Sequence, residues 1–150
     1  MRILLCLFFF CGVMAGGLCP EALAQRAIIG GNETSEGAYP WMAALLQHNG
    51  PDNLSAQFCG GTLIEVDWVL TAAHCLDSET ASTVDVVLGR HDMNSSTGER
   101  IQVRTIIIHP DYNADTGSYD IALLRLSSPS SARPVTIIAQ GDPDTLASAG

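Results

Sequence analysis

The 150-residue chain contains no lysine, and its seven basic residues are all arginines, against 16 acidic residues and a net charge of −9. Nucleic acids and anionic membranes both select for clustered basic side chains, because such clusters neutralise phosphate groups. The composition therefore argues against nucleic acid and against a membrane surface as partners. Acidity by itself names no substrate, but it fits an exported protein.

Long hydrophobic runs are also scarce, and the longest occupies residues 3–18, directly after Arg2. The segment Ala22-Leu23-Ala24 follows it with the small-x-small pattern of a signal peptidase site. An uncleaved membrane anchor is the alternative, but a span needs about 20 apolar residues and this run is shorter and interrupted by glycines. We therefore predict a signal peptide at residues 1–24 and a secreted protein that has no membrane contact after its removal.

Removal of that segment leaves few cysteines, since only Cys59 and Cys75 lie beyond it. In an oxidising compartment two cysteines favour one disulfide, and a loop of this length is worth about 3 kcal/mol in the chain-entropy model. A metal site that adds the neighbouring His74 is the alternative. The three residues lack the paired spacings that are typical of zinc sites, so we predict the disulfide.

Beyond residue 24 no stretch has a sustained helical period. The chain instead alternates short apolar runs with segments rich in Gly, Pro, Asn, Asp and Ser, which predicts an all-β barrel or sandwich. After residue 126 the composition shifts to Ser, Pro and Gly, which is typical of a surface linker that the sequence leaves unfinished. The expected strands are residues 41–47, 57–64, 68–71, 83–88, 101–108 and 120–126.

Four segments of the sequence carry recognisable motifs: IIGG (28–31), CGGTLI (59–64), WVLTAAHC (68–75) and SYDIALLRL (118–126). In this order and at these intervals they resemble the amino-terminal half of the trypsin/chymotrypsin-like serine endopeptidases. The resemblance runs from residue 28 to the end of the sequence. It implies a six-stranded antiparallel Greek-key barrel over residues 28–126, the first of two barrels, and an interdomain linker over residues 127–150.

Catalytic chemistry points to two residues of those segments. A serine hydroxyl is a nucleophile only when a base removes its proton, and histidine, with an unperturbed pKa of about 6.5, suits that task. A carboxylate must then hold the imidazole in one tautomer. The resemblance implies that His74 is the general base and Asp120 the orienting carboxylate, in the His-then-Asp order of the family.

The sequence departs from the family where the nucleophile is expected. The family's serine lies in a Gly-Asp-Ser-Gly-Gly segment, which is absent from these 150 residues together with the specificity pocket and the second barrel. The chain as printed is therefore expected to be an amino-terminal fragment that does not hydrolyse peptides alone. The runner-up interpretation is a non-catalytic homologue that binds or signals, and a stand-alone single barrel is the third.

Activation and cofactors complete the expectations. The resemblance implies a zymogen whose mature amino terminus is Ile28, after a short propeptide at residues 25–27, although a cut after Arg26 would leave one extra residue. Protein or peptide substrates, an activating protease and protein inhibitors are the implied partners. No cofactor and no metal are expected, because Arg90 and Arg100 stand about where a calcium loop would need carboxylates.

Overall fold

The computed structural model describes residues 31–138. The predicted signal peptide (1–24), propeptide (25–27), amino-terminal Ile28 and last part of the linker (139–150) lie outside the described residues. Contacts divide the chain into two units at Glu33/Thr34, and every feature below belongs to the unit that begins at Thr34.

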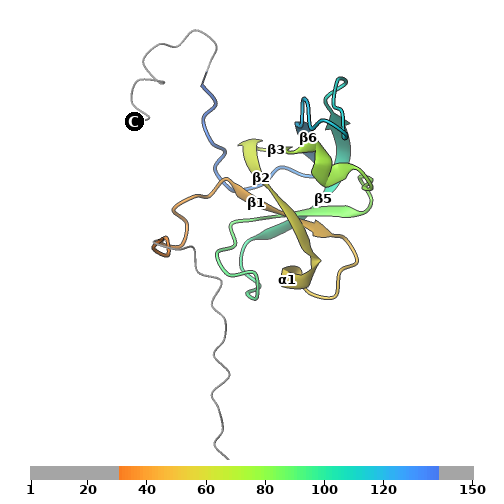
Figure 1. Cartoon of the computed structure of the whole chain (residues 1–150). Coiled ribbons are helices and arrows are strands. Elements are labelled where there is room, and N and C mark those ends of the chain that lie inside the picture. The colour runs from red at the N-terminus through yellow and green to blue at the C-terminus, as the bar shows by residue number, and fades with distance from the viewer. Residues whose placement is uncertain (1–30, 139–150) are drawn as a thin grey trace, which may run out of the picture. The chain divides into compact units, whose positions relative to one another are not determined.

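Six antiparallel strands within the described residues form one closed barrel, in the order β1-β2-β3-β6-β5-β4 (Figure 1). Strand β4 follows β3 in sequence but pairs with β1, which gives the 4-1-2-3 order of a Greek key, and β6 closes the barrel against β3. The prediction of an all-β, six-stranded Greek-key barrel is confirmed. The strands are β1 (Met42–Gln47), β2 (Gln57–Glu65), β3 (Trp68–Thr71), β4 (Val84–Leu88), β5 (Glu99–Ile108) and β6 (Ala122–Leu126).

Alternation along the strands places one side-chain row inside the barrel, because successive residues of a strand point to opposite faces. In β6 the residues Ala122, Leu124 and Leu126 are buried, whereas Arg125 between them is exposed. Strand β4 differs because all five of its residues are buried. The barrel therefore closes around an aliphatic core, whose largest fully buried members are Leu45, Leu46, Leu63, Leu76, Leu88, Leu124, Val69, Val84, Val86 and Val87.

One short helix, which lies before β2, was not predicted from the sequence. Helix α1 (Asn53–Ala56) begins after Asp52, whose carboxylate accepts a hydrogen bond from the backbone N–H of Ser55 at 2.8 Å. Asp52 is thus a helix N-cap, and this bond lowers the pKa of its carboxyl group. A four-residue helix is too short to show a hydrophobic period, so only the cap could have indicated it.

The segment at residues 127–138 forms no helix or strand but is bonded to the barrel. The backbone N–H of Val135 donates to the carbonyl of Leu63 at 2.9 Å. The hydroxyl and backbone N–H of Ser131 donate to the carboxylate of Glu99 and lower its pKa. This stretch therefore runs along the barrel surface after β6 ends.

Candidate active site

His74 lies on a short 3-10 helix, η1 (Ala73–Leu76), which follows β3 after a single intervening residue. Ala73 and Leu76 are buried, at 0% and 2% exposure, whereas the side chain of His74 is 60% exposed. The inward face of this turn is apolar and closely packed, so the turn presents the imidazole to the outside of the barrel.

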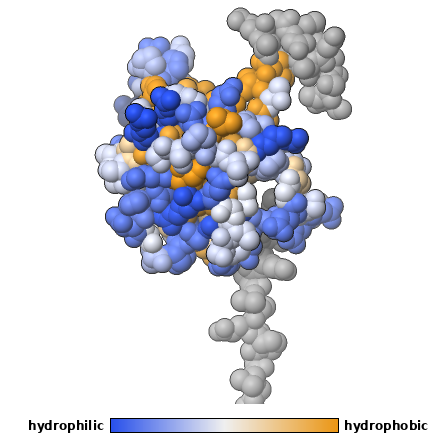
Figure 2. All heavy atoms as spheres, turned by 180° about the vertical axis from the view of Figure 1, so that it is seen from behind, coloured by the Kyte–Doolittle hydropathy of each residue, from blue (hydrophilic) through white to orange (hydrophobic). Residues whose placement is uncertain are grey.

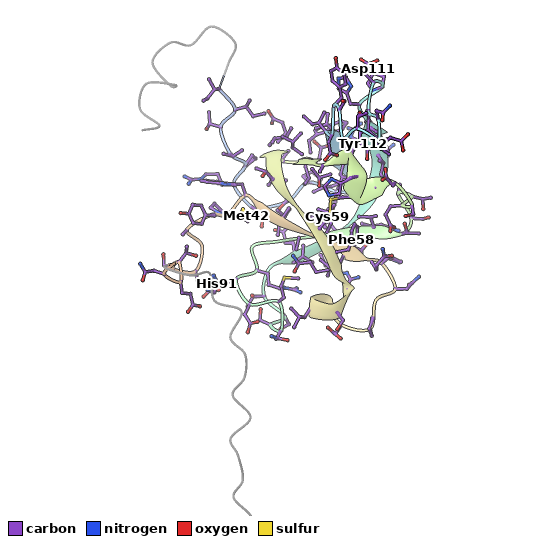
Figure 3. The ribbon with its side chains drawn as sticks, in the orientation of Figure 1. Met42, Phe58, Cys59, His91, Asp111 and Tyr112 are labelled. Carbon is purple, nitrogen blue, oxygen red and sulfur yellow. A yellow bond between two sulfur atoms is a disulfide. The ribbon has the colours of Figure 1, made fainter. Side chains whose placement is uncertain are left out.

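A disulfide joins η1 to β2. Cys59 and Cys75 are bonded, with their Cα atoms 6.1 Å apart (Figure 3). The sulfurs lie within 4.8 Å of a ring nitrogen of His74, the arrangement that raised the metal alternative. A disulfide offers no thiolate for a metal to bind, so the disulfide interpretation replaces the metal one.

Asp120 is carried by a hairpin between β5 and β6. The hairpin is closed at its base by a hydrogen bond from His109 N–H to the carbonyl of Ile121, at 3.1 Å. The N–H of Ile121 in turn donates to the carbonyl of Tyr119 at 2.7 Å, which makes a three-residue turn centred on Asp120. This turn explains why β6 begins at Ala122 and not at Asp120, where the sequence analysis started the strand.

His74 and Asp120, 46 residues apart in the sequence, contact each other twice. The ring nitrogen Nδ1 of His74 lies 2.7 Å from Oδ2 of Asp120, and the backbone N–H of His74 donates to Oδ1 at 2.8 Å. Both carboxylate oxygens are therefore used on one histidine. The side chain of Asp120 is 31% exposed, so this carboxylate is partly open to solvent.

These contacts keep Asp120 ionised. The hydrogen bond from the His74 ring, followed by the one from its backbone, holds the pKa of Asp120 below its usual value of 3.8. Asp120 is thus an acceptor at neutral pH, which places the proton of neutral His74 on Nδ1 and leaves Nε2, 3.6 Å from Sγ of Cys75, as the acceptor nitrogen of the ring. An imidazole in this tautomer can accept a proton from a hydroxyl group placed against Nε2.

Tyr112 lies near the His74–Asp120 pair and was not predicted from the sequence to be a site residue. Its ring packs against the core cluster, and its hydroxyl donates to Oδ2 of Asp77 at 3.4 Å. Asp77 directly follows η1, so this bond links the hairpin to the helix that carries His74. Burial, followed by the charge of Asp77, raises the pKa of Tyr112. Figure 3 shows Tyr112 and Asp111 together in the hairpin, well apart from Met42 and His91.

An apolar groove of about 240 Å³ lies along β5, β6 and the base of the hairpin. Ile107 and Ile121 in its wall are 46% and 43% exposed. Elsewhere the face seen in Figure 2 is mostly hydrophilic, with apolar surface in small patches between polar side chains. The groove residues are Leu70, Ile107, Ile108, His109, Pro110, Ile121, Ala122 and Leu123.

Two arginines flank the loop that was compared with a calcium site: Arg90 lies in the loop after β4, and Arg100 lies at the start of β5. The Nε of Arg90 donates to the carbonyl of Thr97 at 2.7 Å and thereby closes the loop. The Nε of Arg100 donates to the buried carboxylate of Asp85 at 2.7 Å. Both guanidinium groups thus make structural contacts where a calcium ion would need oxygen ligands.

Comparison with known proteins gives one consistent result. The family model described as Trypsin matches residues 28–150. Human chymotrypsin-like elastase family member 1 is 39% identical over 112 residues, which are 72% of this chain and 41% of that protein. Mouse cathepsin G is 48% identical over 101 residues, 66% of this chain and 36% of that protein.

Solved structures agree with the sequence relatives. The VesB protease of Vibrio cholerae superposes with a TM-score of 0.71 at 36% identity, over 79% of this chain and 36% of that chain. The secreted serine protease VesC of Vibrio cholerae gives a TM-score of 0.67 at 41% identity, over 77% of this chain and 25% of that one.

The chain therefore belongs to the trypsin family of serine proteases, and its barrel is the first barrel of the trypsin-like fold. It spans about two fifths or less of the length of the relatives named above. Within residues 31–138, no helix is long and apolar enough to cross a membrane.

Proposed function

We propose that this chain supplies the histidine–aspartate half of the active site of a secreted serine endopeptidase. The observation that carries the proposal is the double contact between His74 and Asp120, at 2.7 Å on the ring and 2.8 Å on the backbone. Such a contact holds an imidazole in one orientation and one tautomer, as a general base requires. The family membership of the chain supplies the reaction type.

In the proposed reaction His74 acts on a nucleophilic serine that is not among the residues of this sequence. Nε2 takes the hydroxyl proton while the serine oxygen forms a bond to the carbonyl carbon of the peptide. The imidazolium is stabilised by Asp120 and then gives its proton to the leaving amine as the C–N bond breaks. Water then hydrolyses the acyl-enzyme by the same steps, with His74 again acting as base and then as acid. The relatives are longer than this chain, so we propose that the serine belongs to polypeptide outside the printed residues.

The apolar groove supports the proposal that a second barrel packs against this one. A solvated groove lined by isoleucines is unfavourable on an isolated barrel, because contiguous exposed apolar surface promotes association. We propose that the second barrel of the protease covers part of this face. Its docking would also reduce the exposure of Asp120, since the groove shares its hairpin with that residue.

Secretion and activation follow from the same proposal. The predicted signal at residues 1–24 and the Cys59–Cys75 disulfide both fit an oxidising compartment. The protein would be made as a zymogen, cut by an activating protease to expose Ile28, and inhibited by proteins that bind the cleft. Amino-terminal sequencing of the active enzyme tests this point: Ile28 is expected, whereas Ala27 or Gln25 at the terminus would contradict it.

A serine-directed fluorophosphonate probe tests the enzymatic proposal. The activated full-length protein should be labelled, and His74→Ala should lose labelling by at least about 10³-fold. His91→Ala is the matched control, because His91 is also exposed and lies apart from the hairpin in Figure 3. A wild-type protein that resists the probe while folded would favour the non-catalytic homologue.

A further inference from the structure

The backbone next to Asp120 adopts an uncommon conformation. Tyr119 has φ +55°, and it is the sole non-glycine residue with positive φ in the part of the chain that the structure describes. The left-handed region is unfavourable for residues with a side chain, and bulky residues are rarely found there. Such outliers persist only where the surroundings enforce them, and they cluster at functional sites.

A ring contact lies across the base of the hairpin, next to this residue. The rings of His109 and Tyr119 are stacked, with centroids 4.9 Å apart and an interplanar angle of 8°. This distance is within the range of favourable offset stacking. The ring of His109 is itself oriented, because its Nδ1 accepts a hydrogen bond from the N–H of Asp111 at 3.2 Å.

Two backbone hydrogen bonds connect the stacked residues to the turn that carries Asp120. The carbonyl of Tyr119 accepts from the N–H of Ile121, and the carbonyl of Ile121 accepts from the N–H of His109. Asp120 lies in the turn that these two bonds hold in place. A change of φ at Tyr119 would rotate the following peptide and move the carboxylate away from the ring and backbone nitrogens of His74, which it now reaches at 2.7 and 2.8 Å.

We propose that His109 and Tyr119 are a positioning pair, whose stack holds Tyr119 in the left-handed conformation and thereby directs Asp120 at His74. The pair touches no substrate and acts only through Asp120. Its value for catalysis rests on the proposed function, but its effect on the tautomer of His74 does not.

The test is the tautomer of neutral His74, read from the ¹⁵N shifts of its ring in the folded full chain. Wild type should hold the proton on Nδ1. Replacing the ring without relieving the backbone, as in Tyr119→Ala, should lower the ratio of the Nδ1–H to the Nε2–H tautomer about tenfold, because the left-handed conformation is then unsupported. Tyr119→Gly should keep the wild-type ratio, since glycine adopts this conformation without help.

Variants at the other ring complete the design. His109→Ala should lower the ratio like Tyr119→Ala, and the double variant His109→Ala/Tyr119→Gly should restore it. His109→Phe keeps a stacking ring and should preserve the ratio. Tyr39→Ala is the matched control, because Tyr39 makes an edge contact with Trp41 away from the hairpin and should have no effect.

Two results would overturn the positioning pair. One is an unchanged tautomer ratio in both Tyr119→Ala and His109→Ala, with folding verified by circular dichroism. The other is a glycine variant at position 119 that behaves like the alanine variant, which would show that φ at this residue is not what the stack controls. In the active protease Tyr119→Ala should lower kcat with little change in KM. If wild type shows no activity, the proposed function fails while the tautomer result still decides the positioning pair.

Discussion

Asp120 binds His74 through both of its carboxylate oxygens, one on the ring nitrogen Nδ1 and one on the backbone N–H. The second bond ties the carboxylate to the backbone of the helix that carries the imidazole. The carboxylate is therefore bonded to both the ring and the backbone of one residue. Neither residue is enclosed, at 60% and 31% side-chain exposure, so orientation here comes from hydrogen bonds and not from burial.

The lowered pKa of Asp120 predicts a specific acid response. A carboxyl group whose folded pKa is depressed stabilises the fold fully above its unfolded pKa, and this contribution is lost as pH falls through the lower folded pKa. Titration of the Asp120 carboxyl carbon by NMR should therefore give a midpoint below that of the urea-unfolded chain. His74→Ala removes the leading cause and should raise the folded midpoint. A folded midpoint at or above the unfolded one would contradict the contact.

The two glycines that follow Cys59 should respond differently to alanine. A Cβ at Gly61 would lie 2.8 Å from the carbonyl oxygen of Leu70, so Gly61→Ala should destabilise the barrel by about 1–3 kcal/mol. A Cβ at Gly60 would have no contact closer than 3.6 Å, and Gly60→Ala should change stability by less than about 1 kcal/mol. Urea unfolding of the two variants measures the difference. Equal losses would contradict the close approach of β2 and β3.

Asp85 and Arg100 form an ion pair whose aspartate is only 6% exposed. Arg100→Met would leave that carboxylate with His48 as its remaining partner, 2.9 Å away, and should cost about 3 kcal/mol. Arg125→Met is the matched control, because its pair with Asp67 is more exposed and should be worth at most about 1 kcal/mol. Thermal or urea unfolding of both variants provides the comparison, and a smaller loss for Arg100→Met than for its control would refute the assignment.

The disulfide should stabilise both the fold and the site. Replacing Cys59 and Cys75 by alanine together should reduce the free energy of unfolding by about 3 kcal/mol, as expected for a loop of 16 residues. Because Cys75 is adjacent to His74, the Nδ1–H tautomer of His74 should also become less populated. Unfolding of the double variant, with the wild type in reductant as a parallel sample, measures the first effect. A reduced wild type that unfolds at the same urea concentration as the oxidised protein would show that the disulfide does not contribute to the free energy of unfolding.

Much of the barrel could be predicted from the sequence because each strand is specified by a short stretch of neighbouring residues. All six strands were placed within two residues at each end, since each is an apolar run between strong turn residues. Helix α1 was missed because it is four residues long and is specified by the single cap Asp52. The strand start at Asp120 was wrong because the turn around it depends on a left-handed Tyr119, which no alternation pattern reveals.

The pairing of His74 with Asp120 could be predicted from the sequence, but the contacts that support this pair could not. His74 and Asp120 were selected by their flanking motifs, and the structure brings them within 2.7 Å of each other. Tyr112 and the stack of His109 on Tyr119 were not foreseen, because such contacts depend on how the hairpin folds back. Their signal in the sequence is only the aromatic and histidine content of the segment between β5 and β6.

The central claim is that Asp120 fixes His74 as a general base, and Asp120→Asn tests it most directly. An asparagine keeps the shape of the side chain, but its amide can donate to Nδ1 and thereby favour the wrong tautomer of His74. In the activated full-length protein, the variant should bind substrate with a KM close to that of the wild type and lose about 10⁴-fold in kcat at neutral pH. A kcat within a few-fold of the wild-type value would contradict the account.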